Sequence, residues 1–188
     1  MPPKVMFTKQ QIINAALQTV RENGQNGLTA RALAARLNCS AKPIFGLFKN
    51  MEELKKEVIV AANELYYNYI EKAVKSQKYP PYKSTGMAYI EFASNEKELF
   101  KLLFMRDRSK ELSIIDDDRI NDVLKLLKDK TGFDDETAKI FHLEMWVFVH
   151  GIATMVATGF LEWDTQFVSR SLTDCYNGLL SNFKNGNL

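Results

Sequence analysis

The stretch RLNCSAKPIFGLF, residues 36–48, interrupts a helical pattern for about three residues and then resumes it. Asn38 can adopt the left-handed conformation that stops a helix, and Ser40 is expected to cap the next helix. Pro43 would then occupy the third position of that helix, still in its first turn, where a missing N–H does little harm. Two short helices joined by so tight a turn predict a helix-turn-helix, with the motif at about 29–48.

Helical signals continue upstream of this stretch. Thr8 and Gln11 form a capping box for a helix that is expected to end at Gly24. Thr29 is expected to cap the helix that leads into the turn. Together with the helix that follows the turn, these elements predict a three-helix DNA-binding domain over residues 1–50.

The rest of the chain also has apolar residues at helical spacing, and alternating strand patterns are almost absent. A capping pair at Asn50 and Glu53 opens a long helix, which is expected to connect two domains over residues 51–78 and to end at KYPPYKS. The fold class is therefore predicted to be all-α, with a second helical domain over residues 79–188. Its helices are expected at about 82–95, 97–106, 116–130, 135–158 and 165–184.

Composition excludes several classes of protein. The 188 residues are 46% hydrophobic and 26% charged, and no apolar run approaches the roughly 20 residues that span a bilayer. The first residues, MPPKVMFTKQQ, lack the apolar core of a signal peptide. Cys39 and Cys175 are far apart and offer neither a disulfide framework nor a metal-site spacing. We therefore expect a cytoplasmic protein with no membrane, metal or cofactor.

The formal net charge of +2 conceals an uneven distribution. Residues 1–50 contain seven basic side chains and one acidic, whereas the rest of the chain contains 18 basic and 22 acidic. A basic segment at one end of a mildly acidic chain favours a polyanion, such as double-stranded DNA, as its partner.

The second short helix, expected from Ala41 to Lys49, would enter the major groove with its small and basic face. Hydroxyl groups and exposed amides at the starts of the two short helices can bind phosphates. The residues predicted to contact DNA are Thr29, Arg31, Ser40, Ala41, Lys42, Pro43, Phe45, Gly46, Lys49 and Lys55.

With these features together, the segment from Thr8 to Leu54 resembles the DNA-binding region of the TetR family of bacterial transcriptional regulators. The matching pieces are TKQQIINAAL, ENGQNGLTARALAARLNCS and IFGLFKNMEEL, in that order and at the family's spacing over about 47 residues. The resemblance implies a homodimer that binds an operator and has a helical C-terminal domain for effector binding and dimerisation.

Five positions depart from the family's pattern, and two of them, Gly46 and Leu47, replace larger polar residues. Phe45 stands where the family often has tyrosine, which removes a phenolic phosphate contact. Met51 stands where lysine is frequent, and Lys49, Lys55 or Lys56 can substitute for that lysine. Asn38 replaces the usual turn glycine, which its backbone preferences tolerate.

The segment KIFHLEMWVFVHGIATMVATG, residues 139–159, is apolar nearly all round, which predicts a helix buried on several sides. Its second half, VHGIATMVATG, resembles a stretch that many family members have before the dimerising end. This helix and the final helix, expected at 165–184, predict a four-helix dimer interface when each subunit contributes both. The residues predicted at this interface are Gly151, Met155, Leu172, Cys175, Gly178 and Leu179.

Aromatic residues and methionines are dense beyond residue 60, and each of them fits an ordinary core position. Together they also fit the lining of an apolar cavity with a few polar groups, the usual form of a small-molecule site. His142, Glu144 and His150 are candidate polar groups. The two histidines do not predict a metal site, because they are eight residues apart and no third ligand is evident. The predicted effector residues are Tyr66, Tyr69, Tyr89, Phe92, Phe104, Met105, Phe141, Met145, Trp146 and His150.

No phosphate loop, nucleophile elbow or HExxH motif is present, so we expect binding without catalysis. The sequence predicts a dimeric repressor that a small apolar or aromatic effector releases from a near-palindromic operator. Two alternatives stay open. One is a regulator of the same fold that has no small-molecule effector, and the other is a helical small-molecule carrier whose N-terminal motif is only a scaffold.

Overall fold

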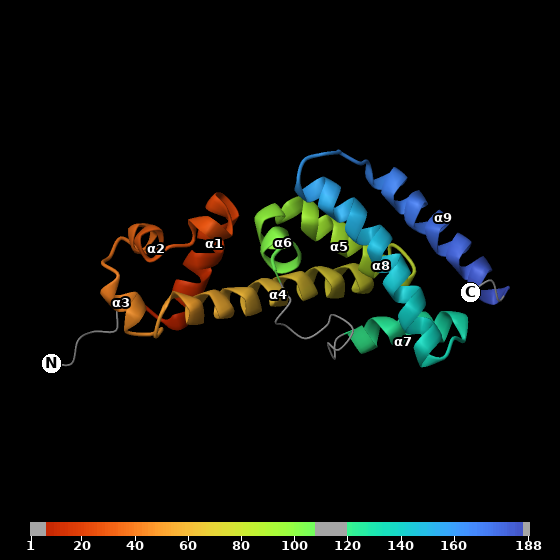
Figure 1. The fold of residues 1–188 in the computed structure, drawn as a ribbon, viewed down its shortest axis with the longest axis horizontal. Coiled ribbons are helices and arrows are strands. Elements are labelled where there is room, and N and C mark those ends of the chain that lie inside the picture. Colours follow the sequence, from red (N-terminus) through yellow and green to blue (C-terminus); the bar gives the residue numbers. More distant parts are fainter. Residues whose placement is uncertain (1–6, 108–119, 186–188) are drawn as a thin grey trace. The chain divides into compact units, whose positions relative to one another are not determined.

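A computed structural model describes residues 7–107 and 120–185, and every regular element within those ranges is an α-helix (Figure 1). This confirms the predicted all-α class. The predicted start of one helix at residue 116 lies outside these ranges. The helices are α1 (Lys9–Gly27), α2 (Ala30–Arg36), α3 (Lys42–Phe45), α4 (Met51–Lys75), α5 (Pro81–Asn95), α6 (Lys97–Phe104), α7 (Ile120–Thr131), α8 (Asp135–Ala157) and α9 (Thr165–Lys184).

The chain forms two compact units, and the division between them falls inside α4. Unit 1 consists of Met1–Tyr67 and Glu96–Arg106, and unit 2 consists of Asn68–Asn95 and Asp107–Leu188. The expected boundaries at residues 50 and 78 differ from this division. Most of α4 belongs with the helix-turn-helix, and so does α6, because α6 packs against α1.

Local signals in α1 determine where the helix begins and bends. The predicted capping box is confirmed: the Gln11 N–H donates to Thr8 Oγ1 at 3.2 Å, and the Thr8 N–H donates to Gln11 Oε1 at 2.8 Å. Gly24 interrupts the helix with a φ of 67°, a conformation that favours glycine. A side chain at Gly24 would also lie 2.9 Å from Glu98 Oε2 on α6. The helix resumes briefly and ends at Gly27, three residues beyond the expected end.

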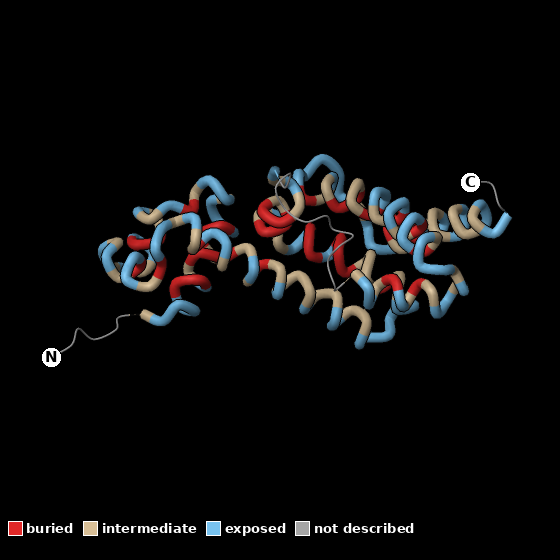
Figure 2. The backbone as a smooth tube through the Cα atoms, turned by 60° about the horizontal axis from the view of Figure 1, so that its bottom comes forward, coloured by how far each residue is buried: buried red, intermediate tan, exposed pale blue. Residues whose placement is uncertain are grey.

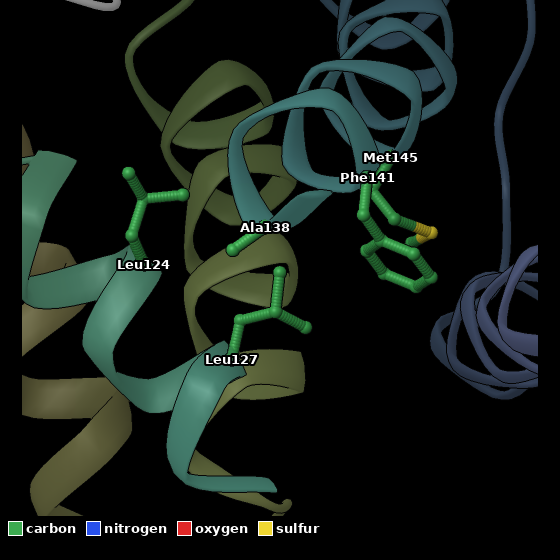
Figure 3. Packing of buried hydrophobic residues seen from close by; sticks show 5 residues of the cluster. All are labelled: Leu124, Leu127, Ala138, Phe141 and Met145. Carbon is green, nitrogen blue, oxygen red and sulfur yellow. The ribbon is translucent and has the colours of Figure 1, made fainter. Parts of the chain in front are cut away.

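Unit 2 is built around the contact between α5 and α8, with α7 and α9 packed against both helices. Its core includes a cluster of five buried residues on α7 and α8, which Figure 3 shows. These residues are Leu124, Leu127, Ala138, Phe141 and Met145. On α9 only Val168 and Leu172 are buried, and the second half of that helix is half-buried or exposed (Figure 2).

Among the helices of the described ranges, α8 has the length and the apolar composition that would let a helix cross a membrane. This corrects the expectation that no segment has these properties. The core helix of a water-soluble domain passes the same test, and the buried residues of α8 pack within unit 2 against α5, α7 and α9.

Candidate nucleic-acid interface

The turn between α2 and α3 is closed by backbone hydrogen bonds. Asn38 has a φ of 49°, and its N–H donates to the Ala35 carbonyl at 3.1 Å. The Cys39 N–H donates to the Ala34 carbonyl at 3.0 Å. This pair of bonds is a Schellman motif, which satisfies the last carbonyls of a helix. The predicted role of Asn38 as a helix stop is therefore confirmed.

The helix after the turn is shorter than predicted, since α3 spans only Lys42–Phe45. The prediction that Ser40 caps it is wrong. Ala41 already has helical backbone angles at the N-cap position, and no side chain caps this end. Pro43 consequently lies at the second position, where its fixed φ suits a helix start. Helical bonding continues beyond α3, because the Phe48 N–H donates to the Ile44 carbonyl at 3.0 Å.

Side chains cap α2, which precedes the turn, and α4, which follows α3. The Ala32 N–H donates to Thr29 Oγ1 at 3.1 Å, which confirms Thr29 as the cap of α2. At the start of α4, the Glu53 N–H donates to Asn50 Oδ1 at 2.9 Å, and Glu53 Oε2 accepts from the Lys49 N–H at 2.6 Å. Thr29 still has a hydroxyl proton to donate, whereas the Lys49 N–H is already bound.

All ten residues predicted to contact DNA are exposed or half-buried. The basic residues among them differ in whether a carboxylate pairs with their charge. In the part of the chain that the structure describes, no carboxylate forms an ion pair with Arg31, Lys42 or Lys49. Lys55 lies 3.4 Å from Glu52, an exposed pair that is worth little. Arg31, Lys42 and Lys49 are thus the cations best placed to meet phosphates.

Two other basic residues of the N-terminal segment are committed to carboxylates within unit 1. Arg21 donates to both carboxylate oxygens of Glu96, at 2.7 Å and 2.8 Å, and Arg36 is paired with Glu22. The count of basic residues in the sequence could not reveal this, because Glu96 lies 75 positions from Arg21. The charge available to DNA is smaller than that count indicates.

Comparison with known proteins agrees with this geometry. A family model described as "Tetracyclin repressor-like, C-terminal domain" matches residues 83–175. The chain belongs to the TetR family. An uncharacterised HTH-type transcriptional regulator of Bacillus subtilis (strain 168), YobS, is 22% identical over 98% of this chain and 99% of its own length.

Solved structures share the fold of this TetR-family regulator. A TetR-like transcriptional regulator from Rhodococcus sp. RHA1 superposes with a TM-score of 0.67 at 15% identity, over 99% of both chains. The multidrug binding protein EbrR, complexed with ethidium, superposes with a TM-score of 0.63 at 19% identity, over 93% of this chain and 99% of that one.

The predicted effector residues of this TetR-family chain fall into separate groups. Tyr89, Trp146 and His150 come together between α5 and α8: the Tyr89 hydroxyl lies 2.9 Å from His150 Nδ1, and Trp146 stacks on His150 with centroids 4.8 Å apart. Tyr69 meets Phe92 edge-on. Phe141 and Met145 belong to the core cluster of Figure 3. Tyr66, Phe104 and Met105 lie in unit 1.

The predicted interface residues also differ in accessibility. Leu172 is only 3% exposed and lies within van der Waals distance of a side chain added at Gly86, so the prediction that it faces a partner is wrong. Cys175 and Leu179 are half-buried against the core cluster. Gly178 is exposed, Gly151 is half-buried, and no atom of the described residues fills the space beside either glycine. Met155 is exposed on α8.

Sequence reasoning missed an exposed apolar surface on α8. It has the helical spacing of one face and includes Met155, which was predicted. We call it the α8 stripe, and its apolar residues are Ile140, Leu143, Val147, Phe148 and Met155, with Gly151 and the exposed Glu144 in the same row. A helix that is apolar nearly all round gives no sign of which face its own subunit covers, so the stripe could not be assigned from the sequence.

A second tyrosine–histidine pair, Tyr82 and His142, is half-buried in unit 2, and we expect it to make the stability depend on pH. The Tyr82 hydroxyl is 2.9 Å from His142 Nδ1, and burial lowers the pKa of His142 to about 4. The unfolded chain therefore binds more protons below pH 6.5. We expect the free energy of unfolding to fall by up to about 3 kcal/mol between pH 6.5 and 4.

Urea unfolding across this pH range tests the prediction, with His142→Gln as the matched variant because glutamine can hydrogen-bond Tyr82 but does not titrate. The variant should lose much less stability on acidification. An equal loss in both proteins would show that His142 is not the group responsible.

Proposed function

We propose that the chain is a dimeric repressor that binds a near-palindromic DNA operator and acts in the cytoplasm. One observation carries the proposal. Arg31, Lys42 and Lys49 are exposed around a closed helix-turn-helix and lack acidic partners among the described residues, whereas Arg21 and Arg36 are neutralised. Cations without acidic partners on a helix-turn-helix supply affinity for DNA phosphates, while α3 supplies the groups that reach base edges.

Selection of duplexes from a random-sequence DNA pool, followed by titration at several salt concentrations, tests this proposal. We expect binding that weakens steeply with salt, and each of Lys42→Ala and Lys49→Ala should lower the slope of log K against log salt by about 0.9. Lys125→Ala on α7 removes an exposed lysine from unit 2 and is the control, with no expected effect. Sequence-specific binding that ignores both changes would contradict the proposed interface.

We also propose that unit 2 binds a small apolar or aromatic effector beside Tyr89, Trp146 and His150. Stacked rings with hydrogen-bonding edges support this, because such groups both cover an aromatic molecule and orient it. EbrR, which shares the fold, is a multidrug binding protein seen with ethidium and with malachite green.

Effector binding can be followed by tryptophan fluorescence, with Trp163→Phe leaving Trp146 as the sole reporter. Aromatic compounds are titrated with and without the selected duplex. A true effector must weaken DNA binding, and DNA must weaken effector binding by the same factor. If every compound tested binds equally in both conditions, or none binds, the alternative of a regulator without a small-molecule effector gains the support.

A further inference from the structure

Arg36 ends α2, two residues before the left-handed Asn38, and its side chain reaches back to α1. Its Nε donates to Thr19 Oγ1 at 3.1 Å, and its Nη2 contacts the Glu22 carboxylate. Thr19 is buried, and its hydroxyl donates to the Ala15 carbonyl at 2.8 Å. The guanidinium is therefore attached at two points to one face of α1.

The acidic partner of Arg36 is itself held in place. Gln18 Nε2 donates to Glu22 Oε1 at 2.9 Å, on the same face of α1 as Thr19. The Gln18 hydrogen bond, followed by that from Arg36, holds the pKa of Glu22 below its usual value. Glu22 consequently remains ionised under the conditions in which DNA binding is measured, and it offsets the charge of Arg36.

A basic residue at the end of α2 in a helix-turn-helix has two contrasting roles open to it. It can contact a DNA phosphate, or it can hold the motif in the shape that binds. We propose that Arg36 is a positioning residue for DNA binding, which fixes the end of α2 on α1 through Thr19 and Glu22. This inference rests on the DNA-binding function proposed above.

The location of Arg36 explains how it would act. The Schellman turn starts at the next residues, and α3 follows directly, so the direction in which α3 leaves depends on the last turn of α2. If Arg36 were released, α2 could tilt on α1 and shift Lys42 relative to Arg31. Contacts from both residues to one duplex would then no longer form together.

The substitution Glu22→Gln separates the two roles by the sign of its effect. The Glu22 side chain is 47% exposed, so loss of its charge should weaken binding to the duplex selected by the wild-type protein by about two- to fivefold. If Arg36 contacted phosphate instead, removal of the neighbouring carboxylate would strengthen binding. Arg36→Gln should weaken binding without changing the salt slope, whereas Arg31→Gln, the comparison for a direct contact, should lower the slope by about 0.9.

Exchange of the pair, Glu22→Arg together with Arg36→Glu, supplies a second test. Because the pair is restored in reverse, we expect this double variant to recover much of the affinity that Arg36→Glu alone loses. Circular dichroism and thermal unfolding establish that each variant is folded, and the exchange decides the matter if Glu22→Gln does not fold.

Unchanged or tighter binding by Glu22→Gln, a reduced salt slope in Arg36→Gln, or no recovery in the exchanged pair would overturn the inference. These outcomes leave the proposed function intact, because the wild-type protein still selects a duplex. A wild-type protein that selects none would contradict the proposed function and, with it, this inference.

Discussion

Replacement of Phe141 by alanine is expected to lower the free energy of unfolding by about 3–5 kcal/mol, the range for deletion of a buried phenylalanine ring. Phe141 is fully buried on α8. Its ring lies 5.3 Å from that of Tyr176 and 5.2 Å from that of Phe183, both on α9 and both edge-on. The ring thus ties α8 to α9, next to the α7 leucines of Figure 3.

Urea unfolding followed by tryptophan fluorescence measures this effect where it occurs, because both tryptophans, Trp146 and Trp163, lie in unit 2. Phe160→Ala is the matched control. Phe160 is 74% exposed, so loss of its ring should change the stability by less than about 0.5 kcal/mol. Similar losses in the two variants would mean that the cluster around Phe141 does not hold unit 2 together.

Val147→Asp on the α8 stripe is expected to convert the proposed dimer into a monomer. Val147 is 62% exposed in the subunit, so the change leaves the core of unit 2 intact. In a dimer that buries the stripe, the same carboxylate would lose its water without gaining a partner, which is costly. Operator binding should fall as well, because a palindromic site is read by two subunits at once.

Light scattering after size exclusion gives the mass directly. Val60→Asp on α4 is the matched control, since Val60 is 56% exposed and belongs to unit 1, whereas the α8 stripe belongs to unit 2. Gly178→Glu on α9 is expected to act like Val147→Asp if α9 also takes part. A dimer that survives Val147→Asp would remove the α8 stripe from the interface, and a monomeric wild-type protein would contradict the dimer itself.

Much of the candidate nucleic-acid interface could be predicted from the sequence because the signals for its helices and turn are local. The capping of α1 by Thr8 and of α2 by Thr29 each joins residues three positions apart. The stop at Asn38 depends on the backbone preference of one residue and on bonds within its own turn. The start of α3 was predicted one residue too early. The prediction took Ser40 as the N-cap, but the N-cap is Ala41, whose backbone angles are already helical.

Only the tertiary structure decided which charges and faces remain available. In the sequence Arg21 adds to the basic charge of the N-terminal segment, but in the structure Glu96 pairs with it. The sequence placed α6 in the second domain, but α6 packs on α1. Along α8, Phe141 points into the core and Val147 points out of it, although both lie in one continuous apolar run. Local sequence sets the helix, but the free energy that orients it comes from apolar area buried against α5, α7 and α9, and all three neighbours lie outside the segment that forms α8.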